Sequence, residues 1–149
     1  MKLAEALQER ADLNRKIQQL RSRLSNNLLV QEGEKTPEDP AELMKELDSS
    51  IKRLQFLMAK INMTNCRTEA DGMTLTEIIA RRDALTLKLE SYQDIVYQAS
   101  RNTDRARHSE IKILSSVNVA DIQKKVDKMS AELRKLDNLL QETNRSTEI

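Results

Sequence analysis

The sequence has very few residues of the kinds that form turns, stack on bases or carry out catalysis. Its 149 residues include two glycines, two prolines, one phenylalanine, two tyrosines and no tryptophan. So few turn residues leave little room for a many-stranded sheet. Two glycines are too few for a phosphate-cradling loop, and no Walker, dinucleotide-binding or nucleophile-elbow motif is present. Binding of single-stranded nucleic acid needs stacking aromatic residues, which are also scarce here.

Cysteine and histidine are equally rare. Cys66 is the single cysteine, so an internal disulfide is excluded. His108 is the only imidazole, so we interpret Cys66 as a small residue near a helix end rather than as a nucleophile. Zinc sites need several His or Cys ligands, and di-iron bundles need Glu-x-x-His pairs that this chain lacks. We therefore predict no catalytic residue, no metal and no cofactor, and we expect a protein that is not an enzyme.

Charge and hydropathy exclude two further classes. The formal net charge is +1, so no overall field attracts nucleic acid or an anionic membrane. The longest uninterrupted apolar run is residues 56–59, whereas a membrane span needs about 20 apolar residues. Charged residues begin at Lys2, which is not typical of a signal peptide. These features predict a cytoplasmic protein with no membrane span.

The clearest positive signal is a regular apolar stripe near the end of the chain. Its members are Val119, Ile122, Val126, Met129, Leu133, Leu136 and Leu140. Gaps alternating between three and four residues place such a stripe on one side of an α-helix, as in a coiled coil. The predicted helix spans residues 119–143. It needs partners, because an amphipathic rod is unstable alone in water.

Three similar stripes predict helices over about residues 2–30, 41–65 and 75–100. The first stripe comprises Leu3, Ala6, Leu13, Ile17, Leu20 and Leu24. The second comprises Met44, Leu47, Ile51, Leu54, Met58 and Ile61. The third comprises Leu75, Ile78, Leu85, Leu89, Tyr92, Val96 and Ala99. Thr74 and Glu77 form a capping-box pattern at the start of the third helix. Four long helices joined mostly by short connections predict an all-α fold, an antiparallel up-down four-helix bundle over residues 1–149 as one domain.

The connection between the first two helices is acidic. Residues 32–48 hold seven acids and two lysines, a net charge of −5. We interpret this run as a solvated loop whose acids favour the start of the next helix, in preference to a docking site for a basic partner.

The connection before the last helix, residues 101–118, is long and basic. Residues 110–116 are rich in β-branched side chains and predict a short strand, or a hairpin arm formed with part of 100–108. Ile111, Ile113 and Val117 are then candidates for pairing with the same strand of another copy across a two-fold axis. The alternative, equally weighted, is an extended segment lying along the bundle.

Two arginines, Arg10 and Arg82, occupy stripe positions in the first and third helices. These helices run parallel in an up-down bundle, so the two side chains are expected at one level. The candidate polar cluster is Arg10, Asn62, Asn65, Arg81, Arg82 and Asp83. Three interpretations remain: a polar layer that fixes register, snorkelling to the surface, or a site for a small anion.

Several short motifs resemble a family of small bacterial helical proteins. They include Asn62-Met63-Thr64-Asn65, the six residues from Gly72 to Glu77, and Ala80-Arg81-Arg82-Asp83. Similar stretches occur at the start of the chain, at residues 38–40 and 109–112, and around Asn144 in the tail. Most members of this family are uncharacterised, and some carry the name septicolysin. Relatives often have Trp after the tail Asn, where this chain has Arg145. The resemblance brings no catalytic residues.

These patterns lead to one main hypothesis and two alternatives. We expect a non-enzymatic scaffold or interaction module that forms a homo-oligomer, a dimer or larger. The alternatives are a septicolysin-like membrane-active toxin and a small-anion-binding protein that uses the arginine and asparagine cluster.

Overall fold

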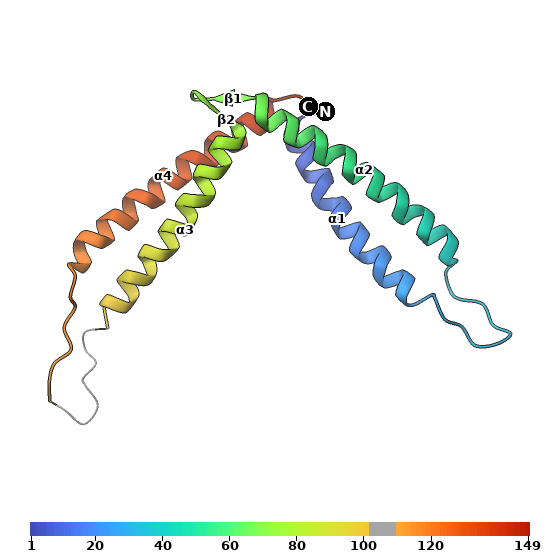
Figure 1. Cartoon of the computed structure of the whole chain (residues 1–149), viewed down its shortest axis with the longest axis horizontal. Helices are drawn as coiled ribbons and strands as arrows, with labels where there is room; N and C mark the ends of the chain where they lie inside the picture. The colour runs from blue at the N-terminus through green and yellow to red at the C-terminus, as the bar shows by residue number, and fades with distance from the viewer. Residues whose placement is uncertain (102–109) are drawn as a thin grey trace. The chain divides into compact units, whose positions relative to one another are not determined.

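The computed structural model describes residues 1–101 and 110–149 and is predominantly helical (Figure 1). Its elements are α1 (Leu3–Ser25), α2 (Pro40–Arg67), β1 (Glu69–Ala70), β2 (Met73–Thr74), α3 (Leu75–Ala99) and α4 (Val119–Ser146). The four predicted helices are therefore confirmed. The first ends about five residues earlier than predicted, and the last continues about three residues further.

The chain divides into two compact units. Unit 1 contains Met1–Thr68 together with Thr143–Ile149, and unit 2 contains Glu69–Glu142. In unit 1 α1 and α2 lie side by side, and in unit 2 α3 packs with α4 (Figure 1). The single core of an up-down four-helix bundle is not confirmed. The prediction that residues 1–149 fold as one domain stays a prediction.

Each unit has its own cluster of buried apolar side chains. In unit 1, Leu20 and Leu24 of α1 pack with Leu43 and the half-buried Leu47 of α2. In unit 2 the buried cluster is made of one α3 residue and two α4 residues, namely Leu89, Val126 and Met129. The stripes predicted for α1, α3 and α4 face these interiors, since most of their members are buried or half-buried.

Local polar contacts explain where the helices begin and end. Asp39 caps α2, because its Oδ1 accepts a 3.0 Å hydrogen bond from the backbone N–H of Ala41. The predicted capping box of α3 is confirmed: Glu77 N donates to Thr74 Oγ1 at 3.2 Å, and Thr74 N donates to Glu77 Oε2 at 2.7 Å. The early end of α1 coincides with the buried Asn27, whose amide oxygen accepts a 2.9 Å hydrogen bond from Glu38 N.

The only strands within the described residues form a hairpin between α2 and α3. Glu69 pairs with Thr74 and Ala70 with Met73. The turn residues Asp71 and Gly72 have φ values of 53° and 77°, as a two-residue hairpin turn requires.

The strand or hairpin predicted around 110–116, between the third and fourth helices, is not confirmed by the described residues and stays a prediction. Residues 110–118 contain one bridging residue, Lys112, and no continuous strand. The predicted hairpin partner, 100–108, falls mostly at 102–109, outside the described residues.

The two ends of the chain meet in unit 1 (Figure 1). Leu3 N donates to Thr147 O at 2.8 Å, and Ile149 N donates to Met1 O at 3.1 Å. Lys2 and Glu148 form an antiparallel bridge between these two backbone bonds. The last residues therefore contribute directly to the unit that contains α1.

Candidate interaction surface

Helix α2 carries two rows of residues spaced by seven, one buried and the other about half exposed. Residues seven apart nearly coincide on the same side of an α-helix, so each set forms a row. The buried row is Leu43, Ser50, Leu57 and Thr64. A second row, which we call the outer row, is Met44, Ile51 and Met58, and the row of Leu47, Leu54 and Ile61 lies between the two. The outer-row side chains are 48%, 46% and 47% exposed.

The stripe predicted for α2 is therefore only partly correct. Ile61 is buried and Leu47 and Leu54 are half-buried, as expected for residues facing a neighbour. The three outer-row residues were predicted to pack with them but stand about half in solvent. The small side chains of Ser50 on α2 and Ala6 on α1 are buried in unit 1.

Ion pairs between α1 and α2 follow the other flank of the buried row. Arg53 binds Glu9 through two bonds, Nε to Oε1 at 2.6 Å and NH2 to Oε2 at 2.8 Å. One α-helical heptad away, Lys16 Nζ lies 3.0 Å from Glu46 Oε1. The hydrogen bonds from Arg53 hold the pKa of Glu9 below its ordinary value. Because Glu46 and Arg53 face α1 from this flank, the outer row lies on the flank of α2 away from these pairs.

A third pair lies at the end of α1. Arg23 Nε donates to the two carboxylate oxygens of Glu38 at 3.2 and 3.1 Å. These hydrogen bonds lower the pKa of Glu38. The pair joins the last turn of α1 to the segment just before α2, so it fixes the loop end of the helix pair.

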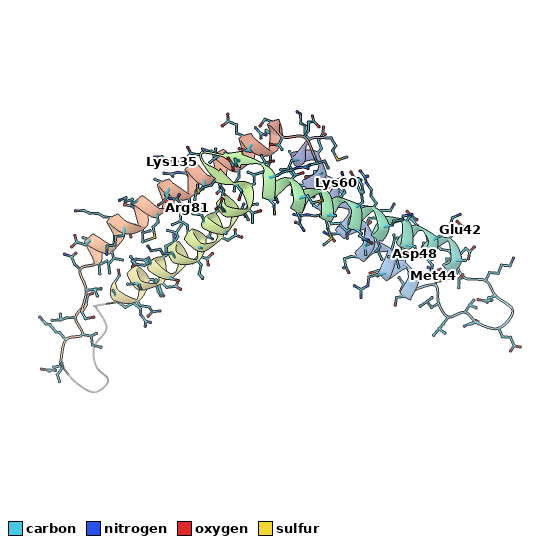
Figure 2. All side chains as sticks on the ribbon, turned by 45° about the horizontal axis from the view of Figure 1, so that its top comes forward. Glu42, Met44, Asp48, Lys60, Arg81 and Lys135 are labelled. Atoms are coloured by element: carbon cyan, nitrogen blue, oxygen red, sulfur yellow. The ribbon has the colours of Figure 1, made fainter. Side chains whose placement is uncertain are left out.

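Asp48 of α2 and Arg10 of α1 have opposite charges, and neither side chain has a partner within residues 1–101 and 110–149. Asp48 follows Met44 by one helical turn, and both lie on the same side of α2 (Figure 2). Arg10 belongs to a row of α1 whose other members, Leu3, Ile17 and Leu24, are buried. Arg10 is half-buried, and neither its side chain nor that of Asp48 makes a hydrogen bond or ion pair within residues 1–101 and 110–149.

The predicted polar cluster is divided between the two units. Arg10, Asn62 and Asn65 lie in unit 1, and Arg81, Arg82 and Asp83 lie in unit 2. Arg82 donates to Asp83 Oδ1 at 3.0 and 2.9 Å, and Arg81 instead donates to Glu132 Oε1 at 2.8 Å. Among the described contacts of these six residues, only Arg82 and Asp83 bind each other. The anion site and the polar layer stay predictions.

The residues predicted for pairing between copies are exposed. Ile111, Ile113 and Val117 are 71%, 41% and 43% exposed. Ile113 and Val117, with Leu114 and with Ile95 and Ala99 of α3, line an open groove of about 470 Å³ in unit 2. Their role in pairing between copies stays a prediction.

The described residues contain neither a metal-binding cluster nor a membrane-spanning helix. Within residues 1–101 and 110–149, no three His, Cys, Asp or Glu side chains gather in a way that would hold a metal ion. No helix of the described chain has the length and apolar character to cross a bilayer. Cys66 is exposed and forms no disulfide within the described residues.

The fold is that of a predominantly helical protein made of two helix-pair units. The chain belongs to a family described as a family of unknown function (DUF6847), which matches residues 10–149. It is also similar to a solved structure described as a functionally unknown conserved protein from Corynebacterium diphtheriae. The two are 38% identical, the match covers 100% of this chain and 98% of that chain, and the TM-score is 0.92. No curated protein matches. The predicted resemblance to an uncharacterised family with bacterial members is confirmed at this level, and the name septicolysin is not part of it.

Proposed function

We propose that this protein is a non-enzymatic interaction module that acts by self-association. The supporting observation is the outer row of α2. Three large apolar side chains at a strict seven-residue spacing are half-exposed on a helix whose other flank already has a partner. Isolated exposed apolar residues are ordinary, but a regular row on one helix is typical of a surface that packs against another helix.

In this proposal the predicted four-helix arrangement is formed by two copies of the chain and not by one copy alone. Each copy supplies one closely packed pair, α1 and α2, whose outer row has no partner within the described chain. Two copies would supply four helices around a second apolar layer. The outer row of α2 then packs against a helix of the second chain, as a stripe of a coiled coil does.

Light scattering on a size-exclusion peak tests the proposal. We expect a mass of at least twice the 17.1 kDa of one chain at micromolar concentration, with dissociation on dilution. Removing apolar area from water contributes roughly 25 cal/mol per Å², so a two-helix contact supports a reversible dimer. A mass of one chain over the whole accessible concentration range would exclude self-association.

The two alternative functions are distinguished by independent assays. A membrane-active toxin releases dye from liposomes, whereas an interaction module leaves them intact. A small-anion-binding protein gains thermal stability from phosphorylated or carboxylate metabolites, by an amount set by ligand concentration and Kd. We expect neither leakage nor a thermal shift, and either positive result would favour the corresponding alternative.

A further inference from the structure

We infer that the outer row of α2 docks antiparallel on the same row of a second copy, with a two-fold axis at Ile51 and with Arg10 of each copy paired to Asp48 of the other. This inference rests on the self-association proposed above and identifies the surface that carries it. The occupant is a second copy of this chain. The spacing of the row and the charges beside it both support this assignment.

The outer row is self-complementary only when two copies run antiparallel. Met44 and Met58 each lie seven residues from Ile51, on opposite sides. A two-fold axis at Ile51 therefore places Ile51 against its own copy and Met44 against Met58 of the other chain, which is an isologous contact. The row is about 21 Å long at 1.5 Å per residue. Methionine at both ends suits such a contact, because its flexible side chain fills irregular gaps.

The ion pairs of unit 1 fix the level of Arg10 along α2. Glu9 is bonded to Arg53, and Lys16, seven residues later, pairs with Glu46, seven residues earlier. The two helices are thus antiparallel, and Arg10 is level with about residue 52. A two-fold axis at Ile51 brings Asp48 of the second copy level with residue 54. The two charges are then about 3 Å apart along the helix axis, at 1.5 Å per residue.

This arrangement gives each unpaired charge a partner. Arg10 and Asp48 have opposite charges, and neither side chain has a partner among the described residues. Asp48 lies one turn from Met44, and the ion-pair register places Arg10 level with the middle of the outer row. Association across the axis forms the pair twice, once on each side. A parallel dimer in register would instead place Asp48 beside Asp48 of the other copy, and like charges at this spacing repel. The charges therefore favour the antiparallel direction.

Cysteine cross-linking tests the axis directly. In a Cys66→Ser background, which removes the only native thiol, we expect Ile51→Cys to form a disulfide-linked dimer under mild oxidation. Met44→Cys alone should not cross-link, whereas a mixture of Met44→Cys and Met58→Cys chains should. Phe56→Cys is the matched control, because Phe56 is 49% exposed but lies on the opposite side of α2. Self-cross-linking of Met44→Cys would indicate a parallel dimer and overturn the inference.

Charge reversal tests the pairing of Arg10 with Asp48. Arg10→Asp and Asp48→Arg should each raise the dimer Kd by about tenfold, since two symmetric pairs become repulsive, and the double variant should recover most of that loss. Glu42→Arg is the control, an equal reversal on the far side of α2 from Met44 and Asp48 (Figure 2). Equal effects from Glu42→Arg, or no recovery in the double variant, would contradict the pairing.

The outcome for Ile51→Asp separates this inference from the proposed function. We expect that variant to elute as one chain with unchanged helicity. If the wild type is dimeric and Ile51→Asp remains so, self-association stands and the assigned surface is wrong. If the wild type is monomeric, both are wrong. If the wild type is monomeric and instead binds a helix of another protein through this row, the second copy is excluded as the occupant.

Discussion

Thr64 carries a polar group that is buried without a hydrogen-bond partner among the described residues. Its side chain is 1% exposed, and its hydroxyl has no hydrogen-bond partner among the residues described. A buried hydroxyl that loses its bonds to water without replacing them costs about 1–3 kcal/mol. Thr64→Val keeps the shape and removes the hydroxyl. We expect it to raise the free energy of unfolding by about 1 kcal/mol, measured by urea denaturation.

Thr64→Ser is the matched control for that prediction. Serine keeps the hydroxyl and loses the methyl group, so it should lower the free energy of unfolding by about 1 kcal/mol. A Thr64→Val variant that is less stable than the wild type would show that the hydroxyl has a stabilising partner after all.

The Glu9–Arg53 pair predicts a dependence of stability on pH. Hydrogen bonds from Arg53 lower the pKa of Glu9 from its ordinary 4.5. A carboxyl whose pKa is lower in the folded chain stabilises the fold above its unfolded pKa, and this stabilisation is lost as the pH falls through the folded pKa. Because both side chains are partly exposed, we expect Glu9→Gln to cost only about 0.5 kcal/mol at pH 7.

The measurement is the melting temperature of wild type and Glu9→Gln between pH 7 and about pH 3. The difference between them should be constant at neutral pH and should shrink as the pH falls below about 4. Glu90→Gln, at an exposed position of α3 with no bond among the described residues, should show no such convergence. A difference that is independent of pH would mean that the charge of Glu9 does not carry the effect.

At the scale of elements, the hairpin between α2 and α3 depends on a backbone conformation that L-residues rarely adopt. Gly72 has φ of +77°, and a Cβ built there would meet no atom within 4 Å. The cost of Gly72→Ala is therefore backbone strain alone, which we expect to lower the free energy of unfolding by about 1–2 kcal/mol in chemical denaturation. Gly72→Asn should cost less, because asparagine tolerates this region. Equal stability of the alanine and glycine forms would contradict the assigned turn.

The helices were predictable because each carries a long stripe and strong boundary signals. Asp39 with Pro40 and Thr74 with Glu77 mark two helix starts, and both are observed. The hairpin was missed, although Asp71-Gly72 is the pair that a two-residue turn favours. Its strands are only two residues long, too short to show alternation. Residues 110–116 have the composition of a strand, but composition alone does not indicate which segment would pair with them.

The sequence indicates that α2 has one apolar row more than a single neighbour covers, but it does not identify that row as the outer row. Apolar residues of α2 occupy three adjacent rows, beginning at Leu43, Met44 and Leu47, which is wider than a single neighbour covers. The sequence does not indicate which of these rows is not covered by the neighbouring helix. That choice depends on which rows are buried, including Ser50, and on the ion pairs to α1, which are tertiary features. The same contacts determine which charges near the row remain unpaired.

At the scale of the whole molecule, the chain closes on itself in unit 1. The last three residues form backbone hydrogen bonds with the first three, as shown by Leu3 N to Thr147 O at 2.8 Å and Ile149 N to Met1 O at 3.1 Å. Glu148 adds ion pairs to Lys2 at 2.8 Å and to the amino terminus at 3.0 Å. These groups lower the pKa of Glu148, Lys2 having the larger effect. The start of α1 is thus stabilised by residues nearly 150 positions away in sequence.

Deleting residues 147–149 should therefore destabilise unit 1 selectively. Two backbone hydrogen bonds contribute about 2 kcal/mol together, and the exposed ion pairs contribute less. We expect faster hydrogen exchange in α1, with unchanged exchange around Leu89 and Met129 in the core of unit 2. Glu148→Gln removes only the ion pairs and should produce a smaller loss in the same amides. Unchanged protection of α1 in the deletion variant would mean that its packing against α2 alone sustains this helix.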